Sequence, residues 1–182
     1  HKEYRRQRQM CIRDSHHATA FRRDAVQRLL ALRPAVIRGN ASEIIALAGG
    51  QSASKGVDAR DPVQLAEQAA RDLARAQQTV VAVTGEVDFV TDGTREVRVT
   101  GGSPLMPQVT ATGCALTAVV GAFVAVSKQD TYTAAVAALS CFGIAGRRAG
   151  ALADGPGSFA WRFLDALAAL ETDSLTRESP LR

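Results

Sequence analysis

Histidine is missing from almost the whole sequence, because His1, His16 and His17 all lie within the first seventeen of 182 residues. Chemistry in the rest of the chain must therefore use carboxylates, thiols, arginines or backbone groups. The three cysteines form no CxxC pair, which excludes a zinc ribbon and favours reduced thiols. No apolar run approaches the ~20 residues of a membrane span. With 46% apolar and 22% charged residues, the composition is that of one globular domain with a real core.

Two nucleotide-binding signatures are also lacking. Neither GxxxxGK[ST] nor GxGxxG occurs, which argues against a Walker-type NTPase and a Rossmann dehydrogenase. The positive charge is concentrated at the start: residues 1–28 hold eight Lys and Arg against three Asp and Glu, and the remaining residues hold 14 against 15. The opening segment lacks interleaved aromatics and a hydrophobic period. We interpret residues 1–17 as an unstructured leader, and we expect neither a nucleic-acid nor a membrane partner.

Hydrophobic periodicity predicts helices alternating with strands, and hence an α/β fold. Helices are expected at 18–32, 40–47, 61–78, 114–127, 131–148 and 158–171, strands at 35–39 and 79–85, and a hairpin at 87–99. The last nine residues are expected to be a frayed tail. Two central strands are too few to cover these helices, so the chain is expected to be the C-terminal part of a larger fold.

Two strand ends carry polar groups that suit phosphate. In IRGNASEI (37–44), Arg38 near the end of a buried strand must find an anion, and the strand turns directly into a helix. Asn40 and Glu43 fit either the water shell of a metal ion or a simple capping box. In VAVTGEVD (81–88), Thr84 and the following glycine suit phosphate oxygens or an ordinary turn.

A third segment, PQVTATGCALTAVVGAF (107–123), places Cys114 at the first turn of an apolar helix after a loop of small residues. Thiols at helix N-termini are more acidic than usual, so Cys114 is a candidate base or nucleophile. The alternative is a small buried cysteine that packs the helix start. Cys141, mid-helix among apolar residues, is interpreted as core. Together the three segments predict a crevice that handles phosphate.

Four blocks of the sequence resemble motifs of the hydroxyethylthiazole kinase family, in the ribokinase-like superfamily. They are RPAVIRGNASEI, VVAVTGEVDFVTDG, VTATGCALTAVVGAFVA and GPGSFAWRFLDAL, in family order from about Ala20 to Leu170. The resemblance implies a three-layer α/β/α fold, present here as the C-terminal two-thirds with an incomplete sheet. It places a partial kinase domain at 18–173 and a flexible tail at 174–182.

The resemblance implies ATP-dependent phosphorylation of the hydroxyl of 4-methyl-5-(2-hydroxyethyl)thiazole, in thiamine synthesis or salvage. It further implies Mg²⁺, a cytoplasmic location and a homotrimer in the full-length family. The implied roles are Cys114 as the catalytic base, Arg38 and Thr84 as nucleotide contacts, Glu43 as a magnesium contact through water with Asn40 beside it, and Ala111, Thr112 and Gly113 as the anion hole. Alanine stands at 111 where the family commonly has glycine, and the family's upstream strands and helices, with a magnesium-linked aspartate, are not in this sequence.

Other readings stay open at this point. The chain could be a kinase of another small alcohol, or a non-catalytic nucleotide-binding fragment. Because upstream strands are missing, we expect an open sheet edge beside 35–39 or 79–84, with residues 1–17 not packed against it. Open apolar edges promote association. The chain alone is therefore expected to be poorly soluble or loosely folded, and impaired on the thiazole alcohol.

Overall fold

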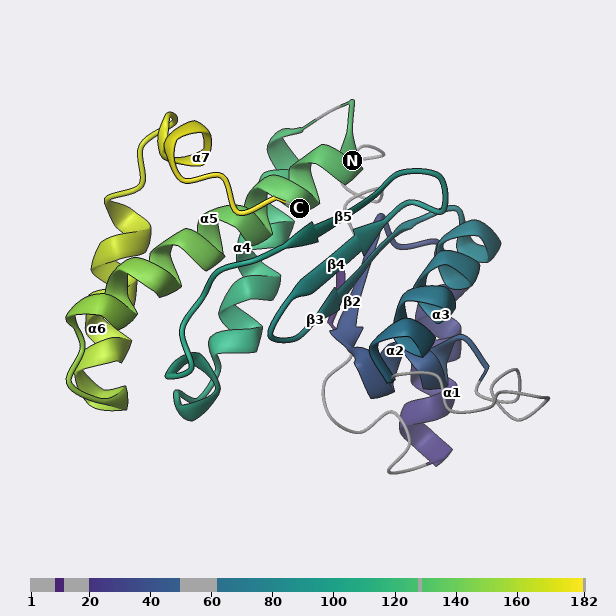
Figure 1. Ribbon diagram of the computed structural model, residues 1–182. Helices are drawn as coiled ribbons and strands as arrows, with labels where there is room; N and C mark the ends of the chain where they lie inside the picture. The colour runs from purple at the N-terminus through teal and green to yellow at the C-terminus, as the bar shows by residue number, and fades with distance from the viewer. Residues whose placement is uncertain (1–8, 12–19, 50–61, 128, 182) are drawn as a thin grey trace. The chain divides into compact units, whose positions relative to one another are not determined.

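The computed structural model describes residues 9–11, 20–49, 62–127 and 129–181, and it shows a mixed α/β protein (Figure 1). The chain forms two compact units, one of residues 1–85 with 89–96 and one of residues 86–88 with 97–182. Within the described ranges, no helix has the length and apolar character needed to cross a bilayer. The α/β class predicted from the alternating elements is confirmed.

The sheet has five strands in the order β1-β2-β3-β4-β5. Its strands β2 (Val36–Asn40) and β3 (Val80–Thr84) run parallel, with Asn40 opposite Thr84. In each of them four consecutive residues are buried, as predicted for parallel strands, and in β2 these include the charged Arg38. The parallel register brings the carboxyl ends of β2 and β3 to the same edge.

The neighbours of these two strands differ from the expectation. β1 (Gln9–Cys11) pairs in parallel with β2, and β4 (Asp88–Thr91) pairs antiparallel with β3. The expected open edge is therefore wrong, because β1 pairs with residues 36–38 of β2 and β4 pairs with residues 81–83 of β3. The expectation that the leader does not pack against the sheet is wrong for residues 9–11. The rest of residues 1–17 lies outside the described residues.

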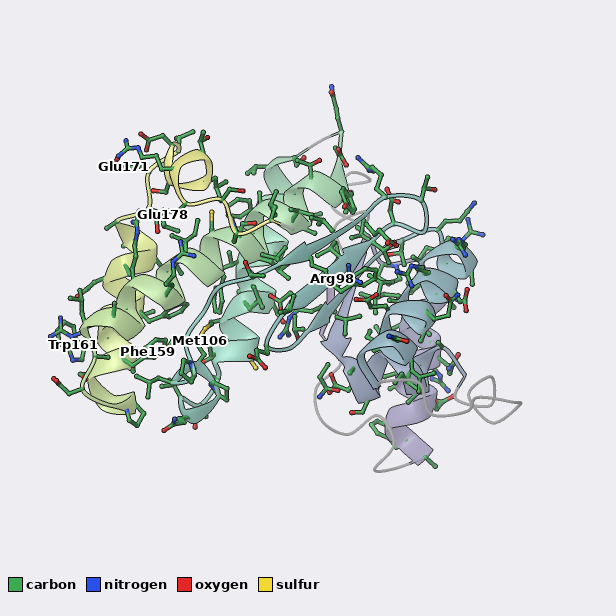
Figure 2. All side chains as sticks on the ribbon, in the orientation of Figure 1. Arg98, Met106, Phe159, Trp161, Glu171 and Glu178 are labelled. Carbon is green, nitrogen blue, oxygen red and sulfur yellow. The ribbon has the colours of Figure 1, made fainter. Side chains whose placement is uncertain are left out.

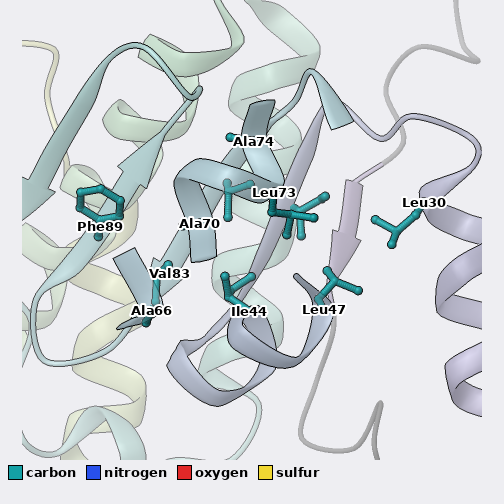
Figure 3. Packing of buried hydrophobic residues seen from close by; sticks show 11 residues of the cluster. Leu30, Ile44, Leu47, Ala66, Ala70, Leu73, Ala74, Val83 and Phe89 are labelled. Carbon is teal, nitrogen blue, oxygen red and sulfur yellow. The ribbon is translucent and has the colours of Figure 1, made fainter. Parts of the chain in front are cut away.

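The core of the first unit lies between the sheet and the helices α1 (Ala20–Leu30), α2 (Ala41–Leu47) and α3 (Pro62–Gln77) (Figure 3). Its buried members are Leu30, Ile37, Ile44, Leu47, Ala66, Ala70, Leu73, Ala74, Val81, Val83 and Phe89. The members on α3 recur three and four residues apart, which places them on one helix face. Three of these members are alanines, whose small side chains allow α3 to lie close to β3.

The hairpin formed by β4 and β5 (Glu96–Val99) is attached to α3 by two arginines. Arg71 Nε donates to Glu96 Oε2 at 2.7 Å, and Arg75 Nε donates to the carbonyl oxygen of Gly93 at 2.9 Å. Gly93 has φ +91°, which suits the tight turn predicted for this position. The predicted hairpin is confirmed.

The second unit is mainly helical and contains η3 (Met106–Gln108), α4 (Thr112–Val126), α5 (Thr131–Leu152), α6 (Pro156–Ala168) and α7 (Ser174–Arg177). The long helix α5 packs against α4, α6 and α7. An aromatic cluster joins α5 to α6: the ring of Phe163 lies edge-on to Phe142 at 4.7 Å and stacks with Phe159 at 5.7 Å, measured between centroids.

The C-terminal residues pack against the second unit, which corrects the expected frayed tail. Arg147 Nη2 donates to Glu178 Oε2 at 2.9 Å, and Arg148 Nε donates to Glu178 Oε1 at 3.0 Å. The amide and the hydroxyl of Thr100 both donate to the carbonyl oxygen of Pro180 at 2.8 Å. The tail sequence gives no sign of these contacts, because their partners lie about 30 and 80 residues away along the chain.

Replacing Glu178 with glutamine is expected to lower the free energy of unfolding by about 1 kcal/mol near neutral pH. Hydrogen bonds from Arg147 and then Arg148 lower the pKa of Glu178. Its contribution is therefore present above the ordinary glutamate pKa of about 4.3 and is lost as the pH falls through the lowered value. Urea unfolding of Glu178→Gln and wild type should differ at pH ~7 and converge in acid.

The matched control is Glu171→Gln, because Glu171 is exposed and makes no ion pair within the part of the chain that the structure describes (Figure 2). This variant removes the same charge and should leave the unfolding midpoint nearly unchanged. Equal losses in both variants would mean that net charge, and not the contact with α5, sets the effect.

Candidate functional site

Arg38 and Thr84 belong to neighbouring strands and contact each other. Arg38 Nη2 donates to Thr84 Oγ1 at 3.2 Å, and Thr84 Oγ1 donates to the carbonyl oxygen of Gly39 at 3.3 Å. Arg38 is only 9% exposed. A cation with so little exposure needs hydrogen bonds or anions around it. The parallel register of β2 and β3 therefore brings a guanidinium and a hydroxyl together near the carboxyl edge of the sheet.

Asn40 and Glu43 form a complete capping box at the start of α2. The Oδ1 atom of Asn40 accepts from the Glu43 amide at 3.0 Å and from the Ser42 hydroxyl at 2.8 Å. The Oε2 atom of Glu43 accepts from the Asn40 amide at 2.7 Å. Asn40 already receives two donors on its amide oxygen, whereas Glu43 brings a 5% exposed carboxylate to this edge. Of the two predicted roles, the structural one is confirmed by this geometry.

Gly39 is a site residue that the sequence reasoning missed. A Cβ atom placed on Gly39 would lie 3.0 Å from Glu43 Oε2 and 3.3 Å from Ile44 Cδ1. Its missing side chain thus leaves room for Glu43 to fold back over the strand end. The sequence feature that could have indicated this role is a glycine between an arginine in an apolar run and a helix-capping asparagine.

The turn before α4 has an unusual backbone. Ala111, the N-cap residue, has φ +69° and ψ +4°, in the left-handed region. The alanine that stands where the family commonly has glycine thus adopts a left-handed backbone, which glycine adopts at lower cost. The alanine side chain cannot accept a hydrogen bond from the first amides of α4, as a serine or aspartate cap would. Helix starts of this kind are suited to an anion from outside the chain.

Thr112 and Cys114 complete this turn. Thr112 Oγ1 donates to the carbonyl oxygen of Val109 at 2.8 Å, and the Ala115 amide donates to Ala111 O at 2.9 Å. Cys114 is exposed on the first turn of α4, so the alternative of a buried packing cysteine is wrong. Cys141 is half-buried in α5, and burial raises the pKa of its thiol.

The candidate residues thus form two groups. Arg38, Asn40, Glu43 and Thr84 lie together in the first unit, and the four consecutive residues from Ala111 to Cys114 form one turn in the second unit. The assembly of both groups into one crevice stays a prediction. Among the described residues, no three His, Cys, Asp or Glu side chains gather as a metal-binding group.

Comparison with known proteins gives consistent matches. The model of the hydroxyethylthiazole kinase family matches residues 14–173. A hydroxyethylthiazole kinase of Rhizobium leguminosarum bv. trifolii (strain WSM2304) is 67% identical over 161 residues, which cover 88% of this chain and 60% of the relative. That of Gemmatimonas aurantiaca is 60% identical over 162 residues, covering 89% of this chain and 58% of the relative.

A solved structure of a hydroxyethylthiazole kinase protein from Pyrococcus horikoshii OT3 matches with a TM-score of 0.79 and 36% identity. The match covers 91% of this chain and 61% of that one. The expected ribokinase-like fold is thereby confirmed, and the chain spans about 60% of the length of these relatives. With nearly nine-tenths of its residues aligned to these proteins, the chain belongs to the hydroxyethylthiazole kinase family.

Proposed function

We propose that this chain transfers a phosphoryl group from ATP to the hydroxyl of 4-methyl-5-(2-hydroxyethyl)thiazole. Family membership supports the reaction class. The observation that carries the proposal is the exposed thiol of Cys114 at a helix start whose N-cap residue, Ala111, leaves the first amides without a capping side chain. A base beside a helix start whose N-cap residue supplies no side-chain acceptor suits phosphoryl transfer to an alcohol.

The proposed roles follow from the chemistry of each group. Arg38 and Thr84 bind phosphate oxygens of the nucleotide, as a cation and a hydroxyl can do together. The turn Ala111–Gly113 stabilises the charge on the phosphoryl group in transit. The thiolate of Cys114 takes the proton from the alcohol as its oxygen forms the new bond to phosphorus and ADP leaves. Positioning and charge stabilisation account for most of the catalysis of such reactions.

Magnesium belongs to this proposal as well. The buried carboxylate of Glu43 suits an indirect contact through water, since Mg²⁺ keeps several of its waters and binds few carboxylates. Asn40 is a weaker candidate because two donors already occupy its amide oxygen. When bound, Mg²⁺ would neutralise charge on the nucleotide phosphates. The Glu43 carboxylate fits that role through a water molecule.

The variant Glu43→Gln separates the two roles of this side chain. Glutamine can accept from the Asn40 amide as glutamate does, so the free energy of unfolding should change by less than about 0.5 kcal/mol. The loss of the charge should raise the magnesium concentration for half-maximal turnover about tenfold. Titration of turnover with Mg²⁺, alongside a thermal melt, checks both statements. Wild-type magnesium dependence would leave Glu43 with the capping role alone.

The proposal is tested by incubating the chain with ATP, Mg²⁺ and the thiazole alcohol and measuring the phosphate ester. Ester formation supports it. Binding of ATP without ester would favour a non-catalytic fragment, and ester from another small alcohol only would favour a different kinase.

The expected impairment rested in part on an open sheet edge, and the pairing of β1 and β4 removes that reason. A homotrimer and a cytoplasmic location complete the proposal, and sedimentation velocity tests the first.

A further inference from the structure

Three glycines leave one face of α5 without side chains, and the segment that leads to η3 packs on this face. Gly143, Gly146 and Gly150 recur three and four residues apart, so they share this face. The amide of Gly102 donates to the carbonyl oxygen of Gly143 at 2.8 Å. A Cβ atom on Gly150 would collide with the side chain of Ser103. The segment around residues 101–106 thus lies directly on the backbone of α5.

The side chain of Met106 lies close against Gly146 on this face. A Cβ atom placed on Gly146 would lie 2.7 Å from Met106 Sδ, closer than real Cβ atoms approach other atoms, and 3.0 Å from Gly102 Cα, which is a tight contact (Figure 2 labels Met106). The Ser103 amide also donates to Met106 Sδ at 3.4 Å. The side chain of Met106 therefore lies between its own loop and α5, in space that a Cβ atom at position 146 would enter.

Local hydrogen bonds connect Met106 to the start of α4. The Val109 amide donates to Met106 O at 3.2 Å, and Thr112 Oγ1 donates to Val109 O at 2.8 Å. Ala111 then takes the left-handed conformation, which costs an alanine about 1–2 kcal/mol. Strained residues of this kind persist only when their surroundings hold them. The contacts of Met106 with α5 and with its own loop can hold the segment that precedes Ala111.

We propose that Gly146 and Met106 are positioning residues for the turn Ala111–Gly113. Gly146 provides the space, Met106 fills it, and η3 is thereby fixed so that Ala111 keeps its left-handed backbone. This inference rests on the proposed function, in which that turn stabilises the transferred phosphoryl group. It assigns a role in the reaction to two residues outside the groups that are proposed to bind substrate and nucleotide.

Gly146→Ala and Met106→Ala test the inference from opposite sides, because the first fills the space and the second empties it. Gly143→Ala is the matched control: it lies on the same face of α5, gains the same helix propensity, and its Cβ would meet its nearest atoms at an ordinary 3.4–3.7 Å. Hydrogen exchange followed by mass spectrometry reports on the Ala115 amide, which donates to Ala111 O. We expect exchange at this amide to be about tenfold faster in both test variants and within twofold of wild type in Gly143→Ala.

Exchange in α6 should stay at the wild-type rate, and kcat should fall about tenfold in the two test variants with an unchanged KM for ATP. Unchanged exchange at Ala115 in both variants would overturn the inference, as would faster exchange with an unchanged kcat. If Gly146→Ala unfolds, Met106→Ala decides, since it introduces no clash. A wild-type chain without turnover would contradict the proposed function, and the exchange rates would then decide the positioning on their own.

Discussion

Replacing Cys114 with serine is expected to lower kcat at least a hundredfold, with little change in KM for ATP. A well-placed general base contributes about 10²- to 10⁴-fold, and a serine hydroxyl loses its proton far less readily than a thiol. After position 17 the sequence has no histidine that could take over the role. The measurement is steady-state phosphorylation of the thiazole alcohol at several ATP concentrations. A kcat within twofold of wild type would remove Cys114 from the role of base.

Cys141→Ser is the matched control for this variant. It exchanges the same atoms at a half-buried position in the middle of α5. Burial raises the pKa of the Cys141 thiol, which keeps it protonated and unsuited to act as a base. We expect turnover within about twofold of wild type for Cys141→Ser. A similar loss in both variants would indicate that the serine hydroxyl disturbs the second unit and not the chemistry.

The sequence was most informative where neighbouring residues determine the structure. The spacing of Asn40 and Glu43 predicts the capping box, because its two hydrogen bonds join groups within four residues of each other. The two apolar runs predict neighbouring strands that end at one edge of the sheet, and Arg38 and Thr84 lie near that edge. Their hydrogen bond joins residues 46 positions apart, so it also depends on the register of β2 and β3, which no local pattern shows.

Other features depend on contacts that no local pattern shows. The expected start of α4 at Cys114 is two residues late, because nothing about an alanine predicts the left-handed backbone of Ala111. The approach of Met106 to Gly146 joins residues 40 positions apart, and three glycines within a helix are read locally only as weak helix formers. The positioning proposed above for the turn at Ala111 depends on these same features.

The variant Phe159→Ala is expected to destabilise the second unit by about 3–5 kcal/mol, the largest stability effect among these predictions. Phe159 on α6 is fully buried, and its ring stacks with Phe163, which in turn meets Phe142 of α5 edge-on. Truncation removes the buried ring, leaves a cavity and breaks the link between two helices. Because α6 also packs against η3, the loss should extend to the segment that precedes the Ala111 turn.

Trp161→Ala is the control that separates the effect of losing a buried side chain from the effect of losing an aromatic one. Trp161 lies two residues along the same helix and is 52% exposed, so its removal creates no cavity and should cost less than about 1 kcal/mol (Figure 2). Urea unfolding followed by circular dichroism suits both variants, since it does not depend on the single tryptophan. Equal midpoints for the two variants would show that the Phe142, Phe159 and Phe163 cluster does not hold α5 and α6 together. There would then be no reason to expect that a change in α6 reaches the turn at Ala111 through η3.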